Sequence, residues 1–477
     1  MDIVAQAAKT FGSAPALITP QKTLSFAELD DRSARIASAL ASAGIGPGDF
    51  VAIVAPNSPS MFLLLTALLR MGAVAAPVNN RFPERQIQGV LQRLGPKMTL
   101  VDPVADHIGS GSTVELQQFV ANSLAGASAN FQAAIAMERP VSVIHTSASS
   151  GKPKAALHSF SNHWHSATGS AMNLPFGPGD CWLLSLPLYH VGGYSMIFKC
   201  LLGGGSIAVP ALDNLLTESL ARFPVTHLSL VPTQLYRILR TPGGGDLLRE
   251  LKAVLLGGSA VSTPLLVEAI REKIPFYVSY GSTEMSTQVS ASPRPITEIH
   301  ADSGAILPYR EARIALDGEI LVRGLCLFTG YLDEGRLRTA TDTEGWFHTG
   351  DMGSISQEGL LTVLGRKDSM FVSGGENIHP EEIEKALTAV VGIEEAVVVP
   401  SPDMEYGTRP LAWIRTSDDK IGPDDALIAA SVGKMLGRLK TPSSFNRVSE
   451  WVTIPGSAKI DRGWYRKLAA EDSENGL

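Results

Sequence analysis

The stretch FVAIVAPNSPSMFLLLTALLRMGAVAAPV, residues 50–78, decides the fold class. Residues 50–55 and 73–78 are apolar runs of strand length, and residues 61–69 between them are apolar at nearly every position. An arginine and a glycine interrupt the apolar sequence, so it indicates a buried helix between two strands and not a membrane span. Strands without polar alternation are typical of parallel sheets covered on both faces by helices.

The same alternation continues outward from this stretch. We predict further core strands at residues 141–146, 181–186, 206–209, 227–231, 253–256 and 275–280. Residues 105–139 are rich in Ala, Ser and Gly, lack strong periodicity and are expected to form a variable surface stretch. After about residue 300, short alternating segments such as 317–322 predict a β-rich subdomain.

A compact α+β module is predicted near the C-terminus. Pro380 stands at a first helical position with acidic residues in the turn that follows, and apolar residues then recur at helical spacing. Strands at 396–400 and 411–415 and a helix at 426–439 complete it. The fold class is therefore α/β. We expect a large N-terminal domain, 1–366, with two αβ-layered sheets and a β-rich subdomain, and a small C-terminal domain, 367–477.

Composition excludes several classes of protein. The 477 residues include 44% hydrophobic residues, with 40 Lys plus Arg against 47 Asp plus Glu, a net charge of −7. That hydrophobicity excludes a disordered chain, and the acidic balance disfavours nucleic acid or an anionic membrane as a partner. Three widely spaced cysteines and no signal-like N-terminus predict a cytoplasmic protein. The histidines at 145, 158, 163 and 165 lack the spacing of a zinc site.

The most informative motif is Thr146-Ser147-Ala148-Ser149-Ser150-Gly151-Lys152-Pro153-Lys154-Ala155. Backbone amides, hydroxyls and lysines in such a loop can surround phosphate oxygens. The loop is not a Walker A sequence, because Thr146 and Pro153 occupy positions that the Walker pattern reserves for Gly and Ser or Thr. From the residues alone, a phosphate loop and a solvated Ser-rich turn are equally good interpretations.

Further blocks carry residues suited to nucleotide and acid chemistry, although each alone also fits an ordinary turn or a solvated side chain. They are Leu186–Gly193, which includes His190; Gly257-Gly258-Ser259; Tyr280-Gly281-Ser282-Thr283-Glu284; His348-Thr349-Gly350-Asp351; Gly365-Arg366-Lys367-Asp368; Ser373-Gly374-Gly375-Glu376; and residues 455–462, which include Lys459.

In this order and spacing, the blocks resemble the adenylate-forming enzymes, the superfamily that includes acyl- and aryl-CoA synthetases. The similarity covers the chain from the strand at residue 50 to Lys459. Two positions depart from the family pattern, because Ala148 and Ala155 stand where glycines are commonest. Within the family, the o-succinylbenzoate–CoA ligases of menaquinone synthesis are most similar. A 4-chlorobenzoate-type ligase, or a stand-alone module that loads a carrier protein, is the alternative.

The resemblance implies a role for each block. The implied catalytic residues are Lys459, His190 and Thr283. The implied nucleotide-binding residues are Thr146, Ser147, Ser149, Ser150, Gly151, Lys154, Gly257, Gly258, Ser259, Tyr280, Gly281, Asp351 and Arg366. The implied acid- and CoA-side residues are His190, Gly193, Ser282, Gly374 and Gly375, with Asp368 as hinge of a mobile small domain and Glu284 as Mg²⁺ ligand.

The chemistry implied by the resemblance is formation of a thioester in two steps. ATP would first convert a carboxylic acid into an acyl-adenylate, and the thiol of coenzyme A would then displace AMP. ATP, Mg²⁺, coenzyme A and a small carboxylic acid are the expected cofactors and substrates. A nucleotide-binding protein without turnover would not need Lys459, Asp351 and Glu284 together. The sequence does not fix the oligomeric state, and a homodimer stays open.

Overall fold

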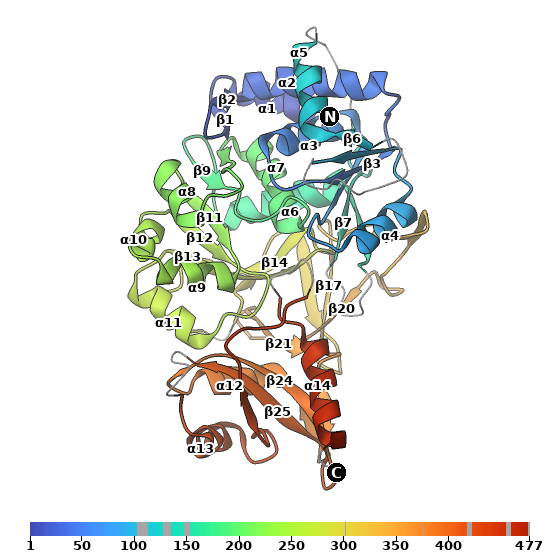
Figure 1. Ribbon diagram of the computed structural model, residues 1–477. Helices are drawn as coiled ribbons and strands as arrows, with labels where there is room; N and C mark the ends of the chain where they lie inside the picture. The colour runs from blue at the N-terminus through green and yellow to red at the C-terminus, as the bar shows by residue number, and fades with distance from the viewer. Residues whose placement is uncertain are drawn as a thin grey trace.

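The computed structural model describes residues 1–102, 113–126, 135–146, 153–300, 302–374, 376–416, 422–454 and 459–475. Figure 1 shows a large lobe, which contains the N-terminus and runs up to β21, above a small lobe, which begins at β22 and contains the C-terminus. Among the described segments, none of the helices combines the length and hydropathy that crossing a bilayer requires.

Two large mixed sheets form the large lobe. The first runs in the order β15 (Ala305–Ile306), β14 (Thr287–Ala291), β13 (Phe276–Ser282), β12 (Ala253–Leu256), β11 (His227–Leu230), β9 (Cys181–Leu183), β10 (Ser206–Ala208), β1 (Pro15–Ile18) and β2 (Thr23–Ser25). The second runs in the order β19 (Arg336–Arg338), β18 (Gly330–Asp333), β8 (Ala155–Ser159), β7 (Pro140–His145), β4 (Val74–Val78), β3 (Phe50–Val54), β5 (Met98–Val101) and β6 (Thr113–Glu115).

The centre of each sheet is parallel, as the apolar strands predict, whereas antiparallel pairing brings in β14, β15 and β2 in the first sheet and β8, β18 and β19 in the second. β3 pairs in parallel with β4 and β5, whereas β7 pairs with β8 in antiparallel fashion. The prediction of wholly parallel sheets was therefore wrong at β8. A parallel pairing needs a crossover of a dozen or more residues, and the connection from β7 to β8 is too short to supply one.

Helices cover both sheets. They are α1 (Ile3–Phe11), α2 (Phe26–Ser42), α3 (Pro59–Met71), α4 (Glu84–Leu94), α5 (Leu116–Ala125), α6 (Phe160–Asn173), α7 (Val191–Gly203), α8 (Leu216–Arg222), α9 (Pro232–Arg240), α10 (Gly244–Arg249) and α11 (Thr263–Arg271). α5 lies within residues 105–139, which were predicted to be a variable surface stretch without strong periodicity. That prediction was wrong for the residues of α5. Its apolar signal is short, and Glu115 caps its first turn.

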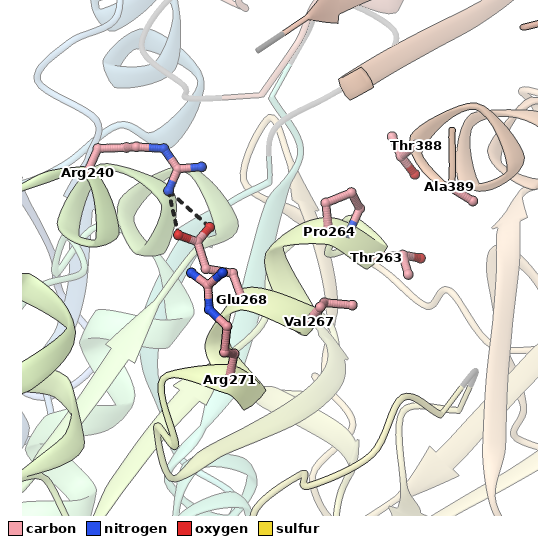
Figure 2. A pocket seen from close by; sticks show the side chains of 8 residues that line it. All are labelled: Arg240, Thr263, Pro264, Val267, Glu268, Arg271, Thr388 and Ala389. Carbon is pink, nitrogen blue, oxygen red and sulfur yellow. Dashed lines mark hydrogen bonds and ion pairs between the residues drawn. The ribbon is translucent and has the colours of Figure 1, made fainter. Parts of the chain in front are cut away.

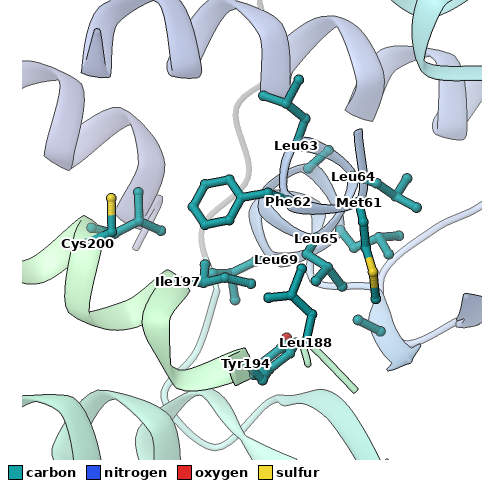
Figure 3. Close-up of a cluster of buried hydrophobic side chains, with 14 of the residues drawn as sticks. Met61, Phe62, Leu63, Leu64, Leu65, Leu69, Leu188, Tyr194, Ile197 and Cys200 are labelled. Atoms are coloured by element: carbon teal, nitrogen blue, oxygen red, sulfur yellow. The ribbon is translucent and has the colours of Figure 1, made fainter. Parts of the chain in front are cut away.

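The main hydrophobic core lies between the two sheets. α3 is buried around its whole circumference, and its leucines contact α7, as Figure 3 shows for Phe62, Leu65 and Ile197. β3 explains the layering, because Val51 and Ile53 face this core while Ala52 and Val54 face α4 on the outside. α8 to α11 bury the outer face of the first sheet.

A smaller sheet joins the two lobes. It runs β16 (Arg310–Ile314), β17 (Glu319–Gly324), β20 (Phe347–Ile355) and β21 (Leu361–Arg366), all antiparallel. This is the β-rich subdomain that the alternating sequence after residue 300 predicts. β21 is the last strand before the small lobe begins.

The small lobe has its own core. It contains β22 (Phe371–Ser373), β23 (Glu376–Ile378), α12 (Pro380–Thr388), β24 (Ile393–Asp403), β25 (Gly407–Thr416), α13 (Asp425–Leu436), β26 (Phe445–Arg447) and α14 (Arg462–Asn475). α12 and α13 pack on one face of the β24–β25–β26 sheet, and α14 packs on the other. Pro380 is the first residue of α12, as predicted.

The β13–β14 hairpin is the tightest turn near the ends of the central strands. A Cβ placed on Gly281 would lie 1.9 Å from the carbonyl oxygen of Thr287. Ser286 and Thr287 have φ of 55° and 139°, which are strained values for residues with side chains. Ser166 of α6 holds both, because its Oγ donates to the Ser286 carbonyl and contacts Thr287 Oγ1.

We expect Gly281→Ala to lower the free energy of unfolding of the large lobe by about 1–3 kcal/mol, because the added methyl group must push the hairpin apart. Chemical denaturation followed by tryptophan fluorescence measures the loss. The matched control is Gly177→Ala, where the nearest atom to the added carbon would lie at an ordinary 3.6 Å. Equal stability of the two variants would contradict the constraint.

Candidate active site

Asp351 lies where three strands meet. It sits on β20 directly opposite Arg366 of β21, and the Arg366 Nη1 donates to its Oδ1 at 3.1 Å. Tyr280, at the end of β13, donates its hydroxyl to the other carboxylate oxygen at 2.6 Å. Burial raises the pKa of Asp351, while Tyr280 and Arg366 act against that rise. A carboxylate held in this way presents its acceptor oxygens beside the end of β13.

Glu284 follows Tyr280 by four residues, and its carboxylate is held by a different strand. The hydroxyl of Tyr331, on β18, donates to Glu284 Oε1 at 2.6 Å. The Tyr331 ring also lies 5.2 Å from the ammonium of Lys154, which precedes β8. Tyr331 therefore connects a carboxylate of the Tyr280–Glu284 motif with a lysine of the 146–155 motif. Glu284 supplies a hard oxygen donor, the ligand type that Mg²⁺ prefers when phosphates complete its coordination.

Thr283 is fixed through its backbone. The carbonyl oxygen of Thr283 accepts a hydrogen bond from His158 Nε2 at 2.7 Å, so His158 carries its proton on that nitrogen. His158 is buried on β8, and burial lowers its pKa to about 4. The ring is therefore neutral at physiological pH and acts as a simple donor. Within the described residues no group of acidic, cysteine or histidine side chains forms a metal cluster.

Lys459 reaches this cleft from the small lobe. It precedes α14, and its carbonyl accepts from the Ile454 amide across a short turn. Burial lowers the pKa of its ammonium and Arg366 acts in the same direction, whereas the charges of Asp351 and Glu284 oppose that shift. Solvent still reaches part of the side chain. A residue near the C-terminus thus shares one electrostatic environment with two acids of the large lobe.

His190 lies at the start of α7, near enough to Lys459 for that charge to act on it. It occupies the N-cap position of α7, but its side chain makes no capping hydrogen bond. Burial, then Lys459 and Arg81, lower its pKa to about 4, so the ring is neutral. Gly193 follows one turn later, and a Cβ there would lie 2.1 Å from the Pro187 carbonyl oxygen. Gly193 therefore lets α7 pack against the loop before it.

The remaining predicted residues fall into three groups. Gly257, Gly258 and Ser259 connect β12 with α11 at the same edge of the sheet, and the Gly257 amide donates to the Leu230 carbonyl. Ser282 accepts through its Oγ from the Met285 amide. Gly374 lies in the small lobe, where its amide donates a hydrogen bond to the Tyr406 carbonyl.

The phosphate-loop prediction is only partly within the described chain. Thr146 and Lys154 are described, and the Thr146 amide donates to the Lys154 carbonyl at 2.9 Å. Ser147, Ser149, Ser150, Gly151 and Gly375 lie outside the described residues. Their roles stay predictions.

Three contributors were missed from sequence. Tyr331 and His158 act on Glu284 and Thr283 from β18 and β8, which are far away in the chain. Arg81 influences His190 from the turn before α4. None stands in a recognisable motif, and only the pairing of β8 with β18 brings the first two together.

Comparison with known proteins gives consistent matches. The family described as AMP-binding enzyme matches residues 4–332. A 2-succinylbenzoate–CoA ligase of Salmonella typhimurium is 36% identical over 474 residues, which cover 97% of this chain and 96% of that protein. The corresponding ligase of Escherichia coli K12 is 34% identical and covers 94% of each chain.

Solved structures of the o-succinylbenzoate CoA synthetase of Bacillus subtilis, 28% identical, match nearly the whole chain. The complex with its acyl-adenylate intermediate has a TM-score of 0.85 and covers 98% of each chain. The complex with ATP and magnesium ion has a TM-score of 0.83 and covers 97% of this chain and 98% of that chain. A double mutant bound to a product analogue covers 98% of each chain but has a TM-score of 0.69. On these matches and on the geometry of the cleft, the chain belongs to the AMP-binding enzyme family and is related over nearly its whole length to the 2-succinylbenzoate–CoA ligases.

Proposed function

We propose that this chain is an ATP-dependent acid–thiol ligase that joins 2-succinylbenzoate to coenzyme A through an acyl-adenylate. The observation that carries the proposal is that Lys459 of the small lobe lies near enough to Asp351 and Glu284 of the large lobe for their charges to act on its ammonium. A carboxylate is a poor acceptor for a thiol, because its leaving group would be oxide. Attachment of AMP supplies a better leaving group.

In the first step the chain stabilises charge and aligns the reactants. The ammonium of Lys459 bridges the substrate carboxylate and the α-phosphate, which lowers the repulsion between two anions as they approach. Asp351 and Arg366 bind the ribose, Tyr280 contacts the adenine, and Thr283 and the loop containing Thr146 and Lys154 bind phosphate.

Mg²⁺ suits this site through Glu284. Magnesium in phosphate-transfer sites is bound by one or two carboxylates together with phosphate oxygens, and Glu284 provides such a carboxylate. When bound, the ion offsets the negative charge of the phosphates. Tyr331 orients the Glu284 carboxylate through its hydrogen bond.

In the second step the thiol of coenzyme A attacks the acyl carbonyl. His190, Gly193 and Ser282 line the acid side, and Gly374 and Gly375 line the path of the thiol. The small domain, 367–477, rotates about Asp368 relative to the large domain, 1–366, between the two steps. Two observations support this: β21 ends at Arg366, and the Bacillus adenylate and product-analogue complexes match this chain with different TM-scores.

A buried cation favours a substrate with two carboxylates. Lys199 on α7 is buried with its ammonium 4.3 Å from the centre of the Trp182 ring, and no described acidic residue forms an ion pair with it. The nearby buried Arg310 is already occupied, because its nitrogens donate to Ser166 and to the Gln288 and Pro308 carbonyls. 2-Succinylbenzoate has a second carboxylate, and Lys199, on the same helix that begins after His190, is the cation available to bind it.

Pyrophosphate release measured with a panel of acids, with and without coenzyme A, tests the function. We expect release with 2-succinylbenzoate and formation of its CoA ester. Preference for 4-chlorobenzoate would indicate the aryl-CoA ligase alternative, and adenylation without CoA-ester formation would indicate a protein carrier. A cytosolic location, supported by three unpaired buried cysteines, and a homodimer stay predictions for fractionation and sedimentation experiments.

Lys459→Ala should separate the two steps. Loss of the ammonium should reduce the rate of adenylation by about 100-fold or more, because a charge that stabilises the transition state is removed. Thioester formation from a pre-made acyl-adenylate should stay within about twofold of wild type, because the lysine has no part in that step. Single-turnover assays measure each half-reaction. Comparable loss in both would contradict the assigned role.

Lys199 gives a prediction that depends on pH. Burial and Arg310 lower the pKa of Lys199 to about 7, so its positive charge is present below pH 7 and is lost above it. The ratio of kcat/KM for 2-succinylbenzoate to that for benzoate, measured by pyrophosphate release, should therefore fall as pH rises through about 7. Lys199→Arg should flatten this ratio and Lys199→Met should lower it, while the exposed Lys434→Met control should not. A flat wild-type ratio would contradict the prediction.

A further inference from the structure

One polar contact joins α9 of the large lobe to the sheet of the small lobe. The hydroxyl of Tyr236 on α9 donates to Glu394 Oε2 on β24 at 2.9 Å. The Tyr236 ring lies between two guanidinium groups, 4.6 Å from that of Arg240 and 5.1 Å from that of Arg415 on β25. Arg240 and Arg415 also approach Glu394, at 4.0 and 3.7 Å.

The contact between Tyr236 and Glu394 lies beside an open cleft. Next to it, α11 and the end of α12 enclose a cleft of about 490 Å³ lined by Thr263, Pro264, Thr388 and Ala389 (Figure 2). Arg240 lines the same cleft and is held there by Glu268 at 2.7 Å. α11 and α12 also contact one another beside this cleft, so Tyr236 and its charged partners make one of the attachments between the lobes.

A chain of contacts leads from this attachment toward Lys459. Glu395, next to Glu394, pairs with Arg415 at 2.9 Å and accepts a hydrogen bond from the indole of Trp451. Trp451 lies directly before residues 452–454, which pair with residues 459–461; these two paired segments are called the Lys459 turn. Two backbone hydrogen bonds join them, from the Ile454 amide to the Lys459 carbonyl and from the Asp461 amide to the Val452 carbonyl, each 2.9 Å.

We propose that Tyr236 is a positioning residue for adenylation, because its contact with Glu394 fixes the edge of the small lobe and thereby keeps the Lys459 turn in the cleft. The inference rests on the proposed function for its kinetic consequence, but its structural part does not. Tyr236 touches no reacting group. It acts on the first half-reaction through the location of the small lobe.

Tyr236→Phe tests the proposal, because it removes the hydroxyl and keeps the ring between the arginines. Loss of a hydrogen bond to a carboxylate at a partly exposed site should lower kcat for adenylation about three- to tenfold. KM for ATP and thioester formation from pre-made acyl-adenylate should stay within about twofold, because the large-lobe site is intact. The matched control is Tyr309→Phe, which removes an exposed hydroxyl elsewhere on the large lobe.

Two further measurements complete the test. Glu394→Ala should reproduce the loss, and adding Tyr236→Phe to it should cost less than about twofold more, as expected for two partners of one contact. Hydrogen exchange of the Lys459 turn should be faster in Tyr236→Phe than in wild type and unchanged in Tyr309→Phe. Equal loss in both half-reactions, full additivity, or unchanged exchange would overturn the proposal. If wild type adenylates no acid, the proposed function fails, while the exchange measurement still decides whether Tyr236 positions the turn.

Discussion

The carboxylate of Asp351 is the contact on which the arrangement of the cleft depends. One oxygen binds Tyr280 from the first sheet, and the other binds Arg366 from the strand that leads to the small lobe. Two separately packed parts, the first sheet through Tyr280 and the β16–β21 sheet through Arg366, therefore converge on one side chain. Because Asp351 is largely shielded from solvent, breaking either contact would leave an acceptor without its partner, which costs more than the contact itself contributes.

The residue before the proposed hinge is held firmly to the large lobe. Lys367 donates to Asp317 at 2.6 Å and to Glu319 at 2.9 Å, and its amide donates to the Gly350 carbonyl at 2.7 Å. Glu319 is nearly buried and also accepts from the Gly350 amide, so it ties the same strands together. These contacts raise the pKa of Lys367 and keep it charged. Any rotation of the small lobe that preserves them must begin after residue 367.

Local patterns in the sequence were sufficient to predict the elements whose signals, such as apolar periodicity, lie within the element itself. The β3–α3–β4 unit and α12 follow from apolar runs and Pro380, because each signal lies within one element. The antiparallel pairing of β7 with β8 and the short helix α5 did not follow, since the first depends on connection length and the second has only one apolar turn. For the site, motifs supplied Asp351, Glu284 and Lys459, whereas their neighbours depend on strand pairing between segments more than 100 residues apart, such as Thr283 with His158.

The chemistry of the cleft follows from how its charges are divided between the lobes. The large lobe contributes Asp351 and Glu284, and the small lobe contributes Lys459, so closing the cleft brings opposite charges together before any substrate is present. That attraction is modest, because solvent still reaches Lys459 and the protein around it disfavours its charge. In the proposed mechanism, a nucleotide would add negative charge to the same space, which would strengthen the interaction with Lys459. Loss of pyrophosphate would remove part of that charge, so the attraction that holds Lys459 would weaken after the proposed first step, in the direction that a second, thiol-dependent step requires.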